Sequence, residues 1–263
     1  MTQNKALLNK VIIVTGSTTG IGEAVARRCV ADGAKVLLHG RDQARGEQLA
    51  ADLGEAAALH LDDLADATAP QRLVEATIAA FGRIDGIVNN AAYIVRSNLA
   101  STSADLFDRV MAINARAPLL IIQAALPHLK QSQGAVVNIG SINAYTGEAR
   151  QLDYSMSKAA LMTMSRNLAN ALALDQVRIN HFNVGWVLTP NEYKLKMTEG
   201  LAEGWPDSVE AEHVPRGKMT QPEEIAAHVA FWLSDASRPI SGSVIDLEQY
   251  PVIGRIPVKE GQA

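Results

Sequence analysis

Residues 11–22 read Val11-Ile12-Ile13-Val14-Thr15-Gly16-Ser17-Thr18-Thr19-Gly20-Ile21-Gly22, and this stretch decides how the chain folds. Four β-branched residues favour a strand, and the helical pattern that follows predicts a helix opening at the glycines. Glycines let the backbone approach a ligand closely, and the free N–H groups of a helix N-terminus attract a pyrophosphate. The turn therefore predicts a dinucleotide-phosphate site, although purely structural turns use the same residue types.

The rest of the chain repeats this alternation of short apolar runs and longer helical patterns. We expect strands at Val11–Thr15, Lys35–His39, Ala57–Leu61, Gly86–Asn89, Ala135–Ile139, Arg178–Phe182 and Ser243–Leu247. Helical patterns lie near 21–32, 42–53, 68–82, 103–127, 153–174 and 222–234. Continuous apolar strands joined by helices indicate a parallel sheet covered on both faces, within a single α/β domain spanning residues 1–263.

One stretch of the chain, at about residues 188–220, is irregular and rich in glycine, proline and charge. It is too long for an ordinary loop in a compact domain. We therefore expect a mobile lid or a substrate-binding insertion there.

The composition excludes several classes of protein. A net charge of −4 without a densely basic segment disfavours binding to nucleic acid. The start of the chain has no apolar signal core, and runs such as Leu119–Ile122 are too short to span a bilayer, which predicts a cytoplasmic protein without membrane contact. The single Cys29 lies in an apolar helical pattern and is expected to be a buried, inert thiol.

Tyr154 and Lys158 lie four residues apart in an expected helix, so they share one face. A neighbouring ammonium favours the phenolate, and we expect it to lower the pKa of Tyr154 below the ordinary value of about 10. Such a pair suits proton transfer near neutral pH. Two solvated helix residues are the alternative interpretation.

Asn114 falls on the same helical face as Phe107, Val110 and Met111, so its amide is expected to be buried with hydrogen-bond partners. Pro118, four residues later, has no N–H to give to the Asn114 carbonyl. This predicts a free carbonyl and a kink. A core asparagine beside an incidental kink is the alternative.

In their order and spacing these motifs resemble those of the short-chain dehydrogenase/reductase family, over nearly the whole chain. The family's Thr-Gly-x-x-x-Gly-x-Gly motif corresponds to Thr15–Gly22, and its Asn-Asn-Ala-Gly motif is similar to residues 89–92. Its catalytic tetrad matches Asn114, Ser141, Tyr154 and Lys158. The Tyr–Lys spacing of four disfavours the enoyl-reductase branch, which uses seven. The resemblance implies a doubly wound, seven-stranded parallel sheet of Rossmann type.

The resemblance also implies hydride transfer between a nicotinamide cofactor and an alcohol or carbonyl. Tyr154 would exchange the proton, Lys158 would lower the Tyr154 pKa and hold the nicotinamide ribose, and Ser141 would hydrogen-bond the substrate oxygen. Asn114 would hold a water linked to Lys158 in a proton relay. A capping hydroxyl is the alternative role of Ser141.

The residues after the second expected strand bear on the choice of cofactor. Gly40 stands where family members that prefer NAD usually carry aspartate, and Arg41 is placed to meet a 2′-phosphate. We therefore expect NADP to be preferred, with NAD possible. Arg41 as a solvated helix-opening residue, or one neutralised by Asp42, is the alternative.

The remaining cofactor contacts are carried over from the family's motifs. The full expected set is Gly16, Thr18, Thr19, Gly20, Ile21, Gly22, Arg41, Asp63, Leu64, Asn90, Ala91, Val187 and Thr189. Asp62 is adjacent to Asp63, so the adenine-contacting position could be either. Val184 replaces a usual proline, which puts the rigidity of that turn in doubt, and Ala92 replaces a usual glycine.

Polar residues flank the tetrad and suggest a polyol, sugar or hydroxy acid rather than a steroid or long acyl chain. The expected substrate-binding residues are Asn143, Arg150, Gln151 and Trp186, with Tyr93, Glu148, Asn191 and Tyr193 as further pocket candidates. Arg150 grips a carboxylate or is a solvated loop residue, and both interpretations stay open. We expect no metal site.

Two further expectations concern assembly and rival functions. The resemblance implies a homotetramer, and residues 251–255 are apolar enough to pack against a neighbouring subunit.

A non-enzymatic nucleotide-sensing or scaffold protein of the same fold is the main rival, but a sensor has no need of the tetrad. A sugar-nucleotide epimerase or dehydratase is a third reading, although it usually needs a larger substrate domain.

Overall fold

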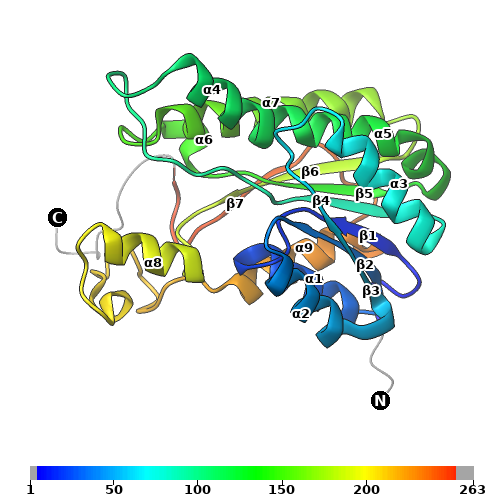
Figure 1. The fold of residues 1–263 in the computed structure, drawn as a ribbon, viewed down its shortest axis with the longest axis horizontal. Coiled ribbons are helices and arrows are strands. Elements are labelled where there is room, and N and C mark those ends of the chain that lie inside the picture. The colour runs from blue at the N-terminus through cyan, green and yellow to red at the C-terminus, as the bar shows by residue number, and fades with distance from the viewer. Residues whose placement is uncertain (1–4, 253–263) are drawn as a thin grey trace.

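The computed structural model describes residues 5–252, and its centre is a sheet of seven parallel strands in the order β3-β2-β1-β4-β5-β6-β7 (Figure 1). The strands are β1 Val11–Val14, β2 Lys35–Gly40, β3 Ala57–Leu61, β4 Gly86–Asn89, β5 Ala135–Ile139, β6 Arg178–Val184 and β7 Val244–Leu247. Every expected strand is present, with ends that differ by two residues or fewer. The prediction of a doubly wound, Rossmann-like parallel sheet is confirmed.

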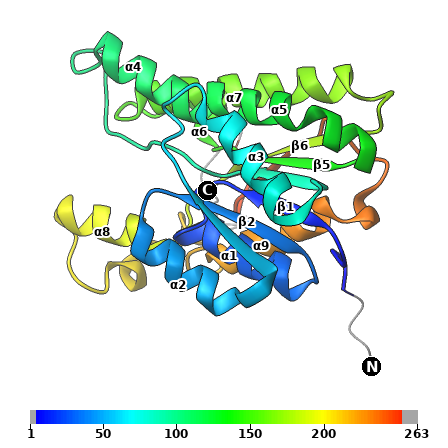
Figure 2. The ribbon, with the colours of Figure 1, turned by 45° about the vertical axis from the view of Figure 1, so that its right-hand side comes forward.

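Helices cover both faces of this sheet, as Figures 1 and 2 show from two directions. On one face lie α1 Gly20–Ala31, α2 Gln43–Leu53 and α9 Pro222–Leu233. On the other lie α3 Ala69–Phe81, α4 Ala104–Met111, α5 Ala117–Ser132 and α7 Leu152–Ala171. Two shorter helices, α6 Asn143–Thr146 and α8 Pro190–Thr198, were not expected from the sequence.

The alternation of side chains along β1 builds the two cores. Ile12 and Val14 pack with Val25 of α1 and Ile225 of α9. Ile13 points to the opposite face and joins the core that α3, α5 and α7 cover. A strand that is apolar at every position is therefore buried on both sides, which is why the sequence of β1 shows no polar alternation.

The order of the strands places a crevice at the carboxyl end of β1. The chain moves from β1 to β2 and β3 on one side, and then crosses to β4 on the other side of β1. At such a reversal the two connections lead away from each other and leave an opening, which is where doubly wound sheets bind ligands.

The predicted long helix at 103–127 is interrupted and extends further than expected. A π-helical turn, Ala112–Arg116, separates α4 from α5, and the Ala117 N–H donates to the Ala112 carbonyl. Pro118 stands in the first turn of α5. The missing N–H of this proline disrupts the regular i→i−4 pattern, so the expected irregularity takes the form of a π-turn centred on Asn114.

Residues 188–220 are less irregular than the sequence suggests. They contain α8, a 3₁₀ turn at Trp205–Ser208 and a small apolar cluster of Trp205, Val214 and Met219. The two ends of the stretch lie side by side, because the Leu188 N–H donates to the Thr220 carbonyl at 2.9 Å. Figure 1 shows α8 apart from the two helical layers.

Within the described residues, the continuous helical stretch Ala104–Ser132 is long and apolar enough to cross a membrane by length and composition. The prediction considered uninterrupted apolar runs, whereas this helical stretch also contains polar residues. Half of its most apolar window is buried inside the fold, and core helices of soluble proteins pass the same test. The helix is accordingly weak evidence for a membrane segment.

Candidate active site

A cleft of about 560 Å³ lies at the carboxyl ends of the central strands. Its lining includes the expected catalytic and substrate-binding residues Ser141, Asn143, Arg150, Gln151, Tyr154, Lys158 and Trp186. It also includes the expected cofactor residues Gly16, Thr18, Thr19, Gly20, Ile21, Arg41, Asp63, Leu64, Asn90, Ala91, Val187 and Thr189. Of the expected residues, Gly22 and Asn114 lie behind the surface of the cleft.

The glycine turn is held from behind by the segment after β4. Gly16 has a φ of +64°, which favours glycine. The Asn90 side chain donates to the Thr15 and Gly16 carbonyls, both at 3.0 Å. A Cβ atom added at Gly22 would overlap the Gly16 carbonyl and lie 2.5 Å from that Asn90 amide. Asn90 and Gly22 therefore fix the turn that presents the N-terminus of α1 to the cleft.

The end of β2 leaves no room for an acidic side chain at Gly40. A Cβ atom there would lie 2.5 Å from the Thr18 methyl group and 2.9 Å from its hydroxyl. The exposed Arg41 guanidinium is the group that reaches this end of the cleft, 3.8 Å from the Asp63 carboxylate. Gly40, which stands where family members that prefer NAD usually carry aspartate, is thus packed closely against the Thr18 side chain.

Asp62 and Asp63 both line the cleft, but their carboxylates differ in availability. Arg72 holds Asp62 at 2.8 Å, and the Asp62 side chain is 14% exposed. Asp63 is 42% exposed and pairs with Arg109 at 3.2 Å. A hydrogen bond from the Ala65 N–H is the largest of the interactions that hold the pKa of Asp63 below its usual value. Asp63 is therefore the more exposed of the two carboxylates.

At the opposite end of the cleft, Tyr154 and Lys158 are 8% and 2% exposed, so they are not a solvated pair. The Lys158 ammonium donates to the Ile139 carbonyl at 2.7 Å and lies 5.6 Å from the Tyr154 ring centre. The Ser141 hydroxyl accepts from the Asn143 N–H at 3.2 Å, so it caps a turn while also lining the cleft.

The expected lowering of the Tyr154 pKa is wrong for this structure. The pKa of Tyr154 is raised to about 12 in total. Burial raises it most, a hydrogen bond with Ser141 lowers it, and the charge of Glu192 raises it further. Burial also lowers the pKa of Lys158 to about 8. For both groups desolvation by burial is the largest effect, because it disfavours the charged form.

Asn114 is buried, and its amide is fully engaged by the surrounding backbone and α7. Its Oδ1 accepts from the Tyr93 N–H at 2.7 Å, and its Nδ2 donates to the Tyr93 carbonyl at 3.1 Å and to Ser157 Oγ at 2.9 Å. Ser157 in turn donates to the Tyr154 carbonyl at 2.7 Å. Asn114 therefore fastens the helix of Tyr154 to the loop after β4, and both of its side-chain N–H groups are occupied.

We expect Asn114→Ala to lower the free energy of unfolding on the order of 1–3 kcal/mol, because buried groups of Tyr93 lose their partners. Denaturant unfolding measures this loss. Asn170→Ala, at an exposed position of α7, is the matched control and should change stability by less than about 0.5 kcal/mol. The proton-relay role is tested separately, because it predicts a changed pH dependence of turnover. Full turnover with an unaltered pH profile would remove that role.

The expected substrate-binding residues are brought to one end of the cleft. Asn143 donates to Gln151 at 2.7 Å, and Trp186 contributes its indole. The Arg150 side chain is 71% exposed and only 3.9 Å from the Glu148 carboxylate, which favours the solvated interpretation of this arginine. Tyr93 and Asn191 line the cleft, whereas Tyr193 stacks behind it on Trp205.

Several cleft residues were missed from the sequence: His39, Arg96, Glu192 and Lys196. His39 is a buried wall residue whose Nδ1 accepts from the Gly16 N–H at 3.4 Å, and burial lowers its pKa to about 4. The sequence signal that could have identified His39 was a single polar residue near the end of an otherwise apolar strand. The other three come from segments whose folding the sequence did not reveal.

Trp205 and Tyr193 of the 188–220 segment form an aromatic stack with Trp186, which precedes the segment. Trp186 stacks on Trp205, with ring centres 5.6 Å apart and planes at 19°. Trp205 is almost fully buried and does not line the cleft, whereas Trp186 does. Trp205 therefore packs the segment together, whereas Trp186 faces the pocket.

The turn after β6 has an unexpected support. A Cβ atom at Gly185 would overlap the Glu248 carboxylate, which sits directly over this glycine. The same carboxylate accepts the Trp186 N–H at 2.9 Å. Glu248, just beyond β7, thereby restrains the turn in which Val184 replaces the family's usual proline. Thr189, at the far end of this turn, uses its hydroxyl to accept the Glu192 N–H at 3.1 Å.

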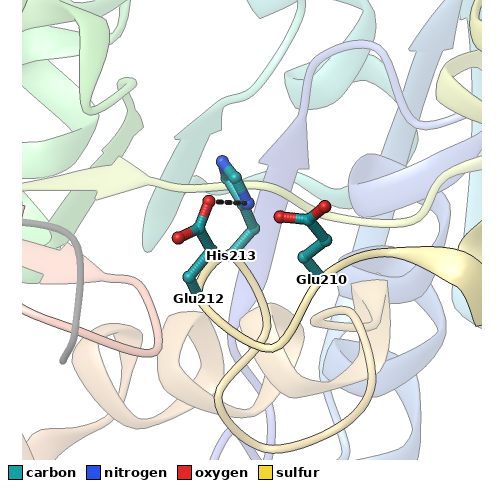
Figure 3. Close-up of side chains that lie close together, drawn as sticks. All are labelled: Glu210, Glu212 and His213. Carbon is teal, nitrogen blue, oxygen red and sulfur yellow. Dashed lines mark ion pairs between the residues drawn. The ribbon is translucent and has the colours of Figure 1, made fainter. Parts of the chain in front are cut away.

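A cluster of Glu210, Glu212 and His213 places possible metal-ligand atoms within 4.8 Å of one another (Figure 3). All three side chains are exposed, and none of them lines the cleft. Exposed acidic groups gather in this way without a metal, so the cluster does not by itself indicate a site.

Residues 16–248 match a family model described as enoyl-(acyl carrier protein) reductase. The chain is 33% identical over 259 residues to meso-2,3-butanediol dehydrogenase from Serratia marcescens, with 97% of each chain covered. It is 35% identical over 238 residues to L-fucose dehydrogenase from Bos taurus, covering 87% of this chain and 84% of the relative.

Two solved structures share the fold. L-Sorbose reductase from Gluconobacter frateurii, complexed with NADPH and L-sorbose, superposes with a TM-score of 0.90 at 26% identity, over 96% of this chain and 100% of the other. A 3-ketoacyl-(acyl-carrier-protein) reductase from Brucella melitensis, complexed with NADH, gives a TM-score of 0.80 at 28% identity, over 91% and 97%.

Proposed function

The chain belongs to the short-chain dehydrogenase/reductase family, whose members act on alcohol and carbonyl groups with a nicotinamide cofactor, and from this we propose that it interconverts a secondary alcohol and the corresponding carbonyl of a small polar substrate. Sugars, polyols and hydroxy acids are the substrate classes in question. The observation that carries the proposal is the convergence of Ser141, Tyr154 and Lys158 at one end of a cleft that has the glycine turn at the other.

The proposed roles follow from the positions of these side chains. When bound, the cofactor supplies or accepts the hydride at the substrate carbon. In reduction, the Tyr154 hydroxyl gives its proton to the carbonyl oxygen, which Ser141 holds by a hydrogen bond. Lys158 stabilises the resulting phenolate. In oxidation the phenolate takes the proton of the substrate hydroxyl.

The glycine turn and the end of β2 fit a dinucleotide. The N-terminus of α1 offers free N–H groups to a pyrophosphate, and Gly22 keeps that turn close to the backbone of Gly16. We propose that Arg41 binds the 2′-phosphate of NADP. The relatives' complexes with NADPH and NADH support a nicotinamide cofactor of either kind.

The spacing of four between Tyr154 and Lys158 favours alcohol and carbonyl chemistry over the enoyl reduction that the description of the family model names. The names of the relatives agree, because they are dehydrogenases and carbonyl reductases. A non-catalytic sensor of the same fold would have no use for a buried Tyr154 beside Ser141.

The test is to follow nicotinamide absorbance with NADP and NAD against a panel of diols, polyols, sugars, hydroxy acids and their ketones. Saturable turnover on any member of the panel supports the proposal. Tight cofactor binding without turnover on the whole panel favours the sensor instead.

We expect Arg41→Ala to reduce the preference for NADP over NAD by about tenfold or more, because a charge-assisted contact to the 2′-phosphate is lost. The measurement is the ratio of kcat/KM values for the two cofactors. Arg45→Ala is the matched control, since Arg45 is a similarly exposed arginine that pairs with Asp42 and does not line the cleft. An unchanged ratio in Arg41→Ala would contradict the assignment.

We also propose that residues 188–220 act as a lid over the single domain, that the protein is cytoplasmic and that it assembles as a homotetramer. The small separate apolar cluster of this segment supports the lid. The expected contact of the C-terminal tail lies mostly outside the described residues, because Ile253–Arg255 are not among them. If light scattering at micromolar concentration showed a monomer, the proposed homotetramer would be contradicted.

A further inference from the structure

Glu192 is an acidic residue in the wall of the cleft, close to the reacting end. It stands in the first turn of α8, where Thr189 accepts its N–H and the helix dipole favours a negative charge. Its carboxylate accepts the Trp186 indole N–H at 2.8 Å, which aims the side chain along the pocket wall. The carboxylate is near enough to Tyr154 for its charge to raise the pKa of that phenol.

The cations of the same region do not neutralise Glu192. Lys196 and Arg96 both bond to Glu199, at 2.9 Å and 2.6 Å. Arg150 is directed to solvent near Glu148. Among residues 5–252, no cation lies within ion-pair distance of the Glu192 carboxylate. This carboxylate instead accepts a hydrogen bond from the neutral Trp186 indole.

A carboxylate held in this way has two consequences for a ligand. It accepts hydrogen bonds from hydroxyl groups through the lone pairs that Trp186 leaves free. It also repels a second carboxylate brought close to Tyr154, and repulsion between partly desolvated charges is stronger than in water. Arg96 and Lys196 line the same cleft, but their charges are already paired with Glu199.

We propose that Glu192 selects neutral polyhydroxylated substrates, by accepting a hydrogen bond from a substrate hydroxyl and excluding carboxylate-bearing analogues. This inference rests on the proposed function and narrows it: hydroxy acids and keto acids leave the substrate class, and neutral sugars and polyols remain. The residue acts on specificity, while Tyr154 retains the proton transfer.

The experiment compares the wild type with Glu192→Gln on two ketoses. L-Sorbose and 5-keto-D-gluconate differ only in that a terminal CH₂OH group of the first is a carboxylate in the second. Glutamine keeps an oxygen for the Trp186 indole, so the fold and the wall of the cleft are preserved. Glu203→Gln is the matched control, because Glu203 is exposed on the same segment and does not line the cleft.

We expect the wild type to favour L-sorbose, and Glu192→Gln to shift the ratio of kcat/KM values toward 5-keto-D-gluconate by about tenfold or more, as a charged acceptor is replaced by a neutral one. The control should keep the wild-type ratio. A ratio that Glu192→Gln leaves unchanged overturns the inference. So does a wild type that favours 5-keto-D-gluconate over L-sorbose.

A binding measurement separates this inference from the proposed function. Tryptophan emission of the cofactor-loaded protein, titrated with each ketose, reports the preference without turnover, because Trp186 is bonded to Glu192. Binding that favours L-sorbose in the wild type and loses that preference in Glu192→Gln supports the inference even if no ketose is reduced. Turnover with equal binding of both ketoses supports the function and removes the inference.

Discussion

Tyr154→Phe should lower kcat on the order of 10²–10⁴-fold, the usual contribution of a positioned general acid or base. The ring remains, so the packing of a side chain that is only 8% exposed is conserved. What disappears is the hydroxyl beside Ser141, the group that we propose exchanges the proton with a substrate oxygen. Steady-state turnover with the best substrate of the panel measures the loss.

The control for this variant is cofactor affinity. Phenylalanine leaves the glycine turn and Arg41 untouched, so the Kd for the cofactor should stay within about threefold of the wild-type value, a free-energy change below about 0.7 kcal/mol. Turnover that survives at more than about a tenth of the wild-type rate would show that another group carries the proton, because a lost general acid costs more than that.

Gly22→Ala should abolish measurable cofactor binding and also destabilise the fold. The added methyl would overlap the Gly16 carbonyl and press on the Asn90 amide. The Gly16 carbonyl belongs to the backbone, so the backbone of the turn has to move. Overpacking of this kind costs typically 1–3 kcal/mol of stability. A moved turn no longer presents the N-terminus of α1, and we expect the cofactor Kd to rise by about a hundredfold or more as that anion site is lost.

Gly54→Ala separates these two effects. Gly54 has a φ of +60° but open space around its Cβ position, far from the cleft residues. An alanine there is strained without a collision, so it should lower thermal stability while leaving cofactor affinity unchanged. Isothermal titration and thermal unfolding of both variants give the comparison. Normal cofactor affinity in Gly22→Ala would contradict the role assigned to this turn.

The sheet was predictable because central strands such as β1 and β5 are largely apolar runs buried on both faces, whereas the edge strands β3 and β7 are only partly buried. Parallel strands of this kind leave a pattern that survives without any knowledge of tertiary contacts, as β1 and β5 show. The glycine turn and the tetrad were predictable for a related reason. Their chemistry demands particular residue types at fixed spacings, and the structure brings nearly all of them to one cleft.

Two kinds of information were missing from the sequence. The first is the balance between burial and charge: Tyr154 and Lys158 share a face as expected, yet desolvation is the largest cause of both pKa shifts. The second is the shape of residues 188–220. Glu192 and Lys196 have no motif around them, and only the fold of α8 brings them to the pocket.

Glu248, which follows the last strand, affects when the site can be completed during translation. The turn after β6 is complete only when the carboxylate of Glu248 has reached Gly185 and the Trp186 N–H, and the ribosome makes Glu248 after the residues that line the cleft. A nascent chain that stops before residue 248 can already contain the glycine turn. It still lacks the restraint on the other wall of the cleft. The lining of the cleft is therefore made before the residue that completes its support.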